Sequence, residues 1–274
     1  MLLRTFNSTQ EAVAALQEDG ASFLGGGTLV VRALNEADPS MKALVRVLHP
    51  GAGKRPVEVK GGEVTLNAAA TMSQVAAHPE LTWLASVAHS VGTPAVRNMA
   101  TVGGNLYARS PYGDFAVALL ALDASVLLVG TDGTKTLPLE EFFVKRESVY
   151  RSCVVTDVTF AAPRDPADFR FRKMSRVKPS GLSVISIAAL IRQDPRGLIA
   201  DARVAYGAMA PTPVRAKGVE AALVGKPRTA AGIADALTRA LDEASPADDA
   251  IASAWYRRAV APVHLRRLLL EADR

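Results

Sequence analysis

Two glycine-rich segments constrain this chain more than any other feature of its sequence. The first, Leu24-Gly25-Gly26-Gly27-Thr28, follows a short apolar run, and the second, Thr101-Val102-Gly103-Gly104-Asn105, lies about eighty residues further along. Glycines let successive backbone N–H groups approach an anion closely, because no Cβ atoms stand in the way. A helix N-terminus adds partial positive charge. Two such loops together indicate a site for an elongated ligand with a diphosphate at its middle, such as a dinucleotide.

Neither loop fits the common nucleotide-binding motifs. A G-x-G-x-x-G pattern that starts at Gly25 has Val30 where the third glycine belongs, and no P-loop lysine is present. An ordinary Rossmann or nucleoside-triphosphate site is therefore not expected. Each loop taken alone is also compatible with a simple turn. Beside the backbone donors, Thr28, Thr101 and Asn105 would supply side-chain hydrogen bonds.

Composition and charge exclude several classes of function. The chain has 274 residues, of which 49% are hydrophobic and 22% charged, as in globular proteins with proper cores. The net charge is +5, but the sequence has no basic stripe with interleaved aromatics of the kind that nucleic-acid binding needs. The longest apolar run, Phe115–Leu122, is too short to span a bilayer. Because the N-terminus also lacks the apolar core of a cleavable signal, a cytoplasmic location is expected.

The reactive residue types form no catalytic or metal constellation. Cys153 is the only cysteine, which excludes an internal disulfide and a cysteine-built zinc or iron–sulfur site; its apolar neighbours predict a buried strand position. No nucleophile–base pair or carboxylate dyad is apparent, so no catalytic residue and no metal ligand are predicted. The basic stretch at residues 170–173 is interpreted as a solvated strand face. The arginines near the C-terminus are interpreted as a solvated helix face or as a docking surface for an acidic partner: Arg257, Arg258, Arg266 and Arg267.

The order of predicted elements indicates an α+β chain in three parts. Ser8 and Glu11 form a capping box that opens a helix. Strands at 21–24 and 43–48 flank a helix at 29–34. From about Pro56 come a hairpin at Lys60–Glu63, helices at 72–77 and 81–89, an irregular stretch from 92 to 114, a helix at 115–122, a hairpin at Asp132-Gly133 and a strand at 153–160.

The third part follows a proline-marked linker at residues 161–166. Three strand-like runs at 169–174, 183–192 and 202–206 precede helices near 214–224, 231–241 and 251–270. This pattern predicts a C-terminal α+β domain with a three-stranded antiparallel sheet and helices. The expected domains are 1–163, with subdomains of about 1–55 and 56–163, and 164–274.

Four segments carry a resemblance to a known family. FLGGGTLVV (Phe23–Val31) resembles the first FAD loop of the flavin subunits of xanthine dehydrogenase and carbon monoxide dehydrogenase, and VRNMATVGGNLYARSPYGDFAVALLALDA (Val96–Ala124) resembles their second loop. The segments Val204–Lys226 and Ser253–Leu269 are similar to the family's C-terminal domain. The resemblance covers essentially the whole chain. It implies an FAD-binding domain of the vanillyl-alcohol-oxidase type over 1–163, with FAD held between its two subdomains.

The resemblance also implies which residues bind FAD. The first loop would wrap the diphosphate and the second would bind from the opposite side. Asp114 would hydrogen-bond a sugar hydroxyl of the cofactor, with a helix N-cap before Phe115 as the alternative. Lys173 matches a lysine close to the cofactor, with an exposed strand lysine as the alternative. The full predicted set is Phe23, Leu24, Gly25, Gly26, Gly27, Thr28, Leu29, Val30, Val91, Thr101, Val102, Gly103, Gly104, Asn105, Asp114, Val155 and Lys173.

Three positions depart from the family pattern. Leu29 follows Thr28 where an acidic residue is usual, Val177 breaks an arginine pair, and Gly181 stands where an aspartate is common. These departures concern flavin tuning and partner contacts.

The function that the resemblance implies is electron transfer inside a molybdenum hydroxylase. A molybdenum-cofactor large subunit would oxidise the substrate, an iron–sulfur small subunit would relay single electrons, and this chain's FAD would pass them to an external acceptor such as NAD, oxygen or a quinone. The alternatives are a standalone flavin-dependent reductase resembling UDP-N-acetylenolpyruvylglucosamine reductase, and a flavin-free scaffold. The segment PTPVRAKGVEAAL (Pro211–Leu223) argues against the reductase.

Overall fold

The structure, a computed structural model, describes residues 2–36, 40–48, 53–178 and 180–271. They group into two compact units, which are described separately. Unit 1 holds the described residues of Met1–His89, Thr93–Ala108 and Ala124–Phe160. Unit 2 holds those of Ser90–Gly92, Arg109–Asp123 and Ala161–Arg274. Two internal segments thus join unit 2 before the chain reaches its C-terminal part.

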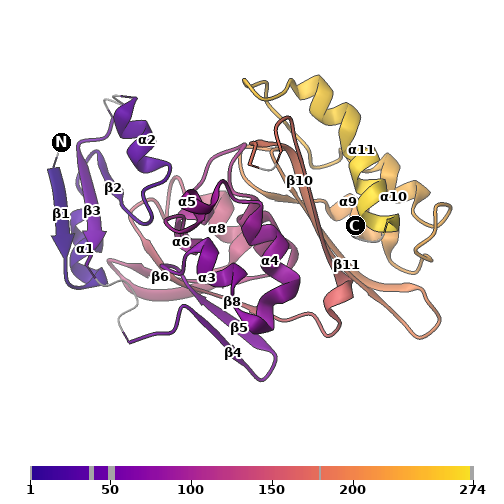
Figure 1. The fold of residues 1–274 in the computed structure, drawn as a ribbon, viewed down its shortest axis with the longest axis horizontal. Coiled ribbons are helices and arrows are strands. Elements are labelled where there is room, and N and C mark those ends of the chain that lie inside the picture. The colour runs from indigo at the N-terminus through magenta and orange to yellow at the C-terminus, as the bar shows by residue number, and fades with distance from the viewer. Residues whose placement is uncertain (1, 37–39, 49–52, 179, 272–274) are drawn as a thin grey trace. The chain divides into compact units, whose positions relative to one another are not determined.

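Unit 1 begins with a three-stranded parallel sheet in the order β1-β3-β2. Its strands are β1 (Leu2–Phe6), β2 (Ala21–Phe23) and β3 (Ala43–Val47). The predicted capping box is confirmed at helix α1 (Thr9–Ala15), where Ser8 and Glu11 satisfy each other's backbone. Helix α1 packs beside β3 (Figure 1) and buries Ala12 and Val13. Strand β1 was not expected, because its leading leucines are exposed and give no alternating pattern.

The second sheet of unit 1 has five strands in the order β4-β5-β8-β6-β7. Both predicted hairpins are confirmed, and at the first one Gly61 and Gly62 take the positive φ angles that a tight turn requires. The strand predicted to complete this part of the chain, β8, is inserted between β5 and β6. The bounds are β4 (Val57–Lys60), β5 (Glu63–Asn67), β6 (Ser125–Gly130), β7 (Gly133–Pro138) and β8 (Val154–Ala161).

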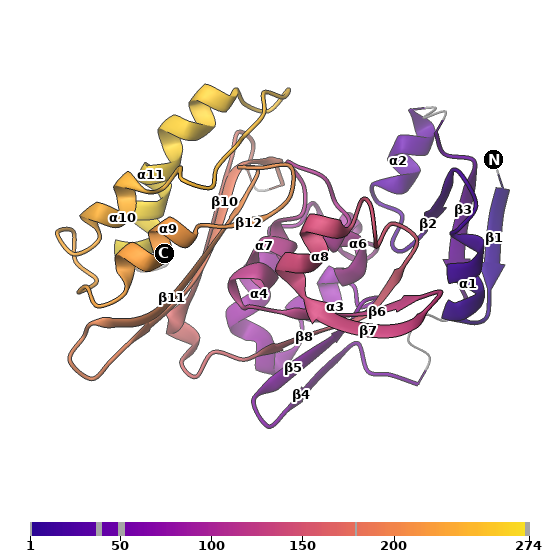
Figure 2. The ribbon, with the colours of Figure 1, turned by 180° about the vertical axis from the view of Figure 1, so that it is seen from behind.

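Short helices complete unit 1. Figure 2 shows α8 (Leu139–Lys145) beside β7. The stretch from 92 to 114 was expected to be irregular, but it contains α5 (Pro94–Arg97) and α6 (Val102–Leu106). Both are too short to show helical periodicity, and each begins at a threonine whose side chain caps it. The remaining helices are α2 (Val30–Asn35), α3 (Met72–Ala76), the 3-10 helix η1 (Pro79–Leu81) and α4 (Thr82–His89).

Unit 2 is built on an antiparallel sheet with four strands, in the order β12-β11-β10-β9, and not the three that were expected. The additional strand is β12 (Val214–Arg215), which pairs with β11 at residues that the sequence pattern assigned to a helix. Two residues are too few for an alternating pattern to appear. The other strands are β9 (Phe169–Ser175), β10 (Ser183–Gln193) and β11 (Ile199–Gly207), with the 3-10 helix η2 (Pro166–Asp168) before β9.

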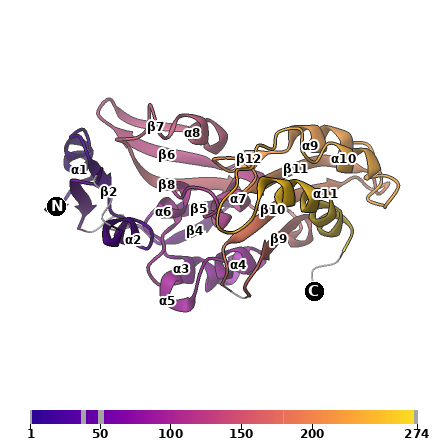
Figure 3. The same cartoon turned by 90° about the horizontal axis from the view of Figure 1, so that it is seen from above.

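Helices cover both faces of this sheet. On one face, α7 (Asp114–Ala121) packs so closely that a Cβ atom on Gly207 would lie 2.6 Å from the side chain of Val117. On the other face, Ile187 and Tyr206 share a core with α9, α10 and α11. Figure 3 shows α9 over β11. Because both faces are covered, nearly every residue of β10 is buried. The bounds are α9 (Lys217–Leu223), α10 (Ala234–Thr238) and α11 (Ala254–Leu270).

Two basic segments of unit 2 are less solvated than predicted. The interpretation of Arg257 as a surface residue is wrong: it is 1% exposed, pairs with Asp249 at 2.8 Å and donates to the carbonyl oxygen of Val184. Arg170 donates to the carbonyl oxygens of Leu268 and Glu271, so this part of β9 ties down the end of α11. Both arginines hold the backbone of unit 2 together.

No helix in the described part of the chain is long and apolar enough to cross a membrane.

Candidate functional site

The first glycine loop connects β2 to α2 in unit 1. Leu24 N–H donates to the carbonyl oxygen of Val45 at 2.7 Å, which fixes the start of the loop against β3. Gly27 has a φ of 76°, and its carbonyl oxygen accepts from Val31 N–H. Among the described residues, the six backbone N–H groups from Gly25 to Val30 have no hydrogen-bond partner. A row of consecutive unused donors on one turn is a binding surface for an anion.

The second loop uses its donors differently. Val102 N–H donates to the Ala70 carbonyl oxygen and Gly103 N–H to that of Ala68, at 2.9 and 2.8 Å. Gly104 and Asn105 N–H donate to the side chain and the carbonyl oxygen of Thr101. The expectation that these backbone donors converge on the same anion is therefore wrong: all four are consumed inside the chain, in part because Thr101 caps α6.

The two loops lie side by side, as the two-loop hypothesis requires. A Cβ atom on Gly26 would overlap the carbonyl group of Met99 and lie 3.2 Å from Ala100 Cα. On Gly25 it would lie 3.1 Å from the Thr101 hydroxyl oxygen. Glycine is thus needed in the first loop for contact with the backbone that leads into the second.

Gly103 serves packing of a similar kind. It is buried, and a Cβ atom there would lie 3.0 Å from the Ala68 side chain and 3.1 Å from its carbonyl oxygen. Gly104 is exposed, and its nearest neighbour would be the Thr101 hydroxyl oxygen at 3.0 Å. Gly103 therefore lets α6 begin directly against the end of β5.

Residues that the sequence analysis missed hold the other end of α6. Tyr107 donates its hydroxyl to the Cys153 carbonyl oxygen at 3.0 Å, and burial raises its pKa well above the ordinary value. Arg146, 2% exposed, donates to the carbonyl oxygens of Leu106 and Ala108. The Arg146 contacts satisfy carbonyl groups at the end of the helix. Nothing in the local sequence near Arg146 indicates this role, because its acceptors are about forty residues away.

A second cluster of predicted residues lies in unit 2. The Asp114 carboxylate accepts from Lys173 Nζ at 2.7 Å and from Ser183 Oγ at 2.6 Å, and Lys173 also donates to the Ser90 carbonyl oxygen at 2.9 Å. The side chains of Asp114 and Lys173 are 8% and 11% exposed. The structure thus brings together two predicted residues distant in sequence and adds Ser183, which no motif marks.

Both alternatives weighed for this pair are wrong. Asp114 is not the N-cap of α7: Gly113 occupies that position with a φ of 92° and no side-chain cap. Lys173 is not an exposed strand lysine, because its ammonium group is buried against Asp114 and Ser90. A buried charge needs a partner of this kind.

The two predicted apolar contacts have different surroundings. Val155 is 5% exposed and pairs with Leu128 in the middle of the five-stranded sheet. Val91 is partly exposed and follows Ser90, the residue that accepts from Lys173. Their contact with a cofactor stays a prediction.

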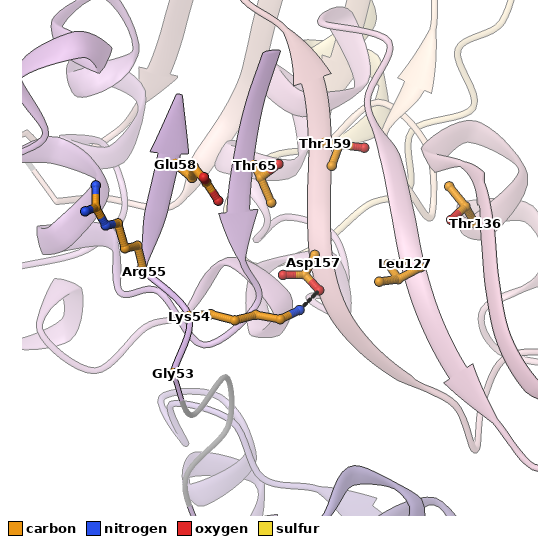
Figure 4. A pocket seen from close by; sticks show the side chains of 9 residues that line it. All are labelled: Gly53, Lys54, Arg55, Glu58, Thr65, Leu127, Thr136, Asp157 and Thr159. Carbon is orange, nitrogen blue, oxygen red and sulfur yellow. Dashed lines mark hydrogen bonds and ion pairs between the residues drawn. The ribbon is translucent and has the colours of Figure 1, made fainter. Parts of the chain in front are cut away.

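The five-stranded sheet also carries a hollow of about 580 Å³, shown in Figure 4. Lys54 Nζ pairs there with Asp157 at 2.6 Å, and threonines from three strands of the sheet also line the hollow. None of the residues that line it belongs to the predicted cofactor set. The lining residues are Gly53, Lys54, Arg55, Glu58, Thr65, Leu127, Thr136, Asp157 and Thr159.

Two family models of known proteins match this chain. Residues 4–160 match the family model described as "FAD binding domain in molybdopterin dehydrogenase". Residues 169–272 match the "CO dehydrogenase flavoprotein C-terminal domain".

Two curated relatives illustrate the range of similarity. The carbon monoxide dehydrogenase medium chain of Hydrogenophaga pseudoflava is 27% identical, over 96% of this chain and 93% of its own. The nicotinate dehydrogenase FAD-subunit of Eubacterium barkeri is 30% identical over 63% of this chain, and the match spans 62% of that relative's length.

Solved structures share the architecture. A carbon monoxide dehydrogenase structure from Hydrogenophaga pseudoflava superposes with a TM-score of 0.86 at 25% identity, covering 98% of this chain and 96% of that one. Quinoline 2-oxidoreductase from Pseudomonas putida 86 superposes with a TM-score of 0.85, covering 99% of this chain and 96% of that one. At 22% identity, this similarity shows the fold alone.

Proposed function

Because the chain belongs to the family of FAD-binding domains in molybdopterin dehydrogenases, we propose that it is the FAD-carrying, electron-transferring subunit of a molybdenum hydroxylase. Its partners are then a molybdenum-cofactor large subunit and an iron–sulfur small subunit, with an external acceptor such as NAD, oxygen or a quinone. The relatives named as medium chains and FAD subunits support this assembly. The proposal includes the cytoplasmic location expected from the sequence.

One observation carries the proposal: six consecutive N–H donors, from Gly25 to Val30, have no partner in the described part of the chain. An FAD diphosphate offers acceptor oxygens and negative charge to such a row. The backbone of Met99 and Ala100 lies against Gly26, and the Thr101 hydroxyl lies against Gly25. Thr28 adds a hydroxyl on the same loop.

The remaining predicted residues are retained as proposed FAD ligands. Thr101 and Asn105 contribute their side chains. Val102, Gly103 and Gly104 act through the position of their backbone, since the N–H groups from Val102 to Asn105 are occupied. Asp114 and Lys173 enter as a charge-neutral pair, because each already satisfies the other. Phe23, Leu24, Val91 and Val155 supply apolar surface.

The chemistry belongs to the cofactor, which when bound accepts electrons singly and releases them in pairs. The chain's residues bind and orient it, and no side chain is proposed to act as acid, base or nucleophile. Lys173 is held by Asp114 and Ser90, so its ammonium group keeps a fixed position. The fold implied is of the vanillyl-alcohol-oxidase type over residues 1–163, with residues 164–274 as the C-terminal domain.

The test is the flavin content of the purified chain. FAD released by denaturation, at about one per chain, with absorption near roughly 375 and 450 nm before release, is the expected result. A colourless chain that takes up no added FAD would establish the scaffold alternative. NADPH-driven reduction of an enolpyruvyl sugar nucleotide by the lone chain would establish the reductase alternative. Partner subunits that carry molybdenum and iron in the native complex complete the proposed assignment.

A further inference from the structure

Helix α11 is apolar on two opposite faces. One face buries Ala261, Leu265 and Leu268 in the core of unit 2. The other exposes large apolar side chains: Trp255 is 76% exposed and Val263 is 47% exposed. A helix at the surface of a globular protein normally presents polar residues to water. Single exposed apolar side chains are common, but an exposed tryptophan in line with further apolar residues is typical of contact surfaces.

These side chains form one continuous stripe. Trp255, Ala259 and Val263 are spaced four residues apart, and Arg266 follows three residues later, so all four lie along one side of the helix. Arg258 borders the stripe near its N-terminal end. We call these five residues the α11 stripe; all are exposed.

The charge of the stripe is uncompensated. Arg258 and Arg266 have no ion pair in the described part of the chain, whereas the neighbouring Arg257 pairs with Asp249 and Arg267 lies 3.9 Å from Glu271. The stripe therefore offers an apolar centre with two guanidinium groups that have no ion-pair partner in the part of the chain that the structure describes. Its chemical complement is an apolar recess bordered by carboxylates.

The stripe is presented rigidly. Ser253 Oγ accepts from Tyr256 N–H at 3.2 Å and caps the helix, and buried Arg257 ties the same turn to Ala247, Ala252 and Val184. A surface that is ordered beforehand loses little conformational entropy on binding. Tryptophan and arginine are also the residue types that most often dominate binding energy at interfaces.

We propose that the α11 stripe docks another subunit of the same assembly, one that carries an acidic surface with an apolar recess for Trp255. The proposal rests on the proposed function, which requires partner subunits. A second copy of this chain is a poor occupant. A two-fold interface centred on the stripe would place the arginines of one copy against those of the other.

The test uses the native complex, recovered through an affinity tag on this chain. Trp255→Asp is one variant, and Arg258→Glu with Arg266→Glu is the other. Val144→Asp is the matched control, since Val144 is 78% exposed on α8 in unit 1. The expected result is about tenfold or greater loss of co-purified subunit for both stripe variants, normal recovery for the control, and unchanged FAD per chain in all three.

A photo-crosslinking residue in place of Ala259 identifies the occupant. A crosslink to an acidic surface of another subunit supports the proposal, and a crosslink to a second copy of this chain overturns it. Full recovery of partner subunits with both stripe variants also overturns it. FAD content separates the two proposals: a wild-type chain that assembles without FAD contradicts the proposed function and leaves the docking result to be judged by recovery.

Discussion

Gly26 stands against Met99 so closely that a Cβ atom at Gly26 would lie 2.6 Å from the Met99 carbonyl carbon. This contact joins the loop with the open N–H donors to the segment that leads into the second glycine loop. No side chain fits between them, so the shape of the proposed anion site depends on a glycine whose own φ angle is ordinary.

Gly26→Ala is therefore expected to separate the loops. The added methyl group has only backbone to displace, which costs about 1–3 kcal/mol of stability as overpacking does elsewhere, and FAD affinity should fall roughly tenfold or more because the donor row loses its wall. Urea unfolding and flavin titration measure the two effects. Gly61→Ala is the control. It strains a positive φ angle in the turn between β4 and β5, where an added Cβ atom would have no neighbour within 4 Å. Equal FAD affinity in the two variants would contradict the expectation.

Lys173→Met should destabilise unit 2 strongly. It leaves the Asp114 carboxylate buried, with the Ser183 hydroxyl as its remaining side-chain donor among the described residues, and breaking a buried pair from one side costs about 3–5 kcal/mol. Adding Asp114→Asn removes the uncompensated charge and should restore part of that loss. A double-mutant cycle by urea unfolding measures the coupling. Additive effects of the two substitutions would show that the pair is not coupled.

Cys153 should react slowly despite being partly exposed. Burial, followed by the nearby charge of Asp132, raises the pKa of its thiol and so lowers the thiolate fraction at neutral pH. We expect alkylation by iodoacetamide at pH 7.5 to be roughly tenfold slower in the folded chain than in urea. Mass spectrometry follows the modification. Equal rates in both states would show that the thiol is open to solvent.

His264 should make the chain sensitive to mild acid. Burial lowers its pKa below the ordinary 6.5, and Arg172 and Arg267 add to the effect, while Glu271 opposes it. The unfolded chain then binds a proton at higher pH than the folded chain. The contribution of His264 to the free energy of unfolding is therefore fully present above the pKa of the unfolded chain. It is lost as the pH drops through 6.5 toward the lower pKa of the folded chain. The urea midpoint of the wild type should fall from pH 7 to 5 more than that of His264→Leu. Parallel pH profiles would remove His264 as the cause.

Much of the fold could be predicted because its signals are local. The Gly61-Gly62 turn and the Ser8 capping box each depend on residues within four positions of one another. Strand β12 and helix α6 could not be predicted in the same way. A two-residue strand exists only because Tyr206 and Ala205 of β11 stand opposite it, and α6 is specified by hydrogen bonds to Ala68 and Ala70.

In the candidate site, too, local features could be predicted and contacts between distant residues could not. The glycines marked both loops, but their composition does not tell which N–H groups remain open. The Gly103 N–H donates to the carbonyl oxygen of Ala68, a partner far away in sequence, whereas the Gly25 N–H finds no acceptor among the residues that the structure describes. Ser183 and Arg146 escaped prediction for the same reason: their acceptors are Asp114 and the end of α6, and only the folded chain brings them together.

Helix α7 lies upstream of the linker at residues 161–166, yet it covers one face of the β10–β11 sheet of unit 2. If the chain were divided at that linker, the sheet would lie in one polypeptide and the helix that covers it in the other. The C-terminal fragment would then expose Val184 and Ser186 of β10 to solvent, although both are buried in the intact chain. Complete burial of this face of β10 therefore requires α7, so the chain beyond the linker reaches its folded state only together with a helix that is synthesised before it.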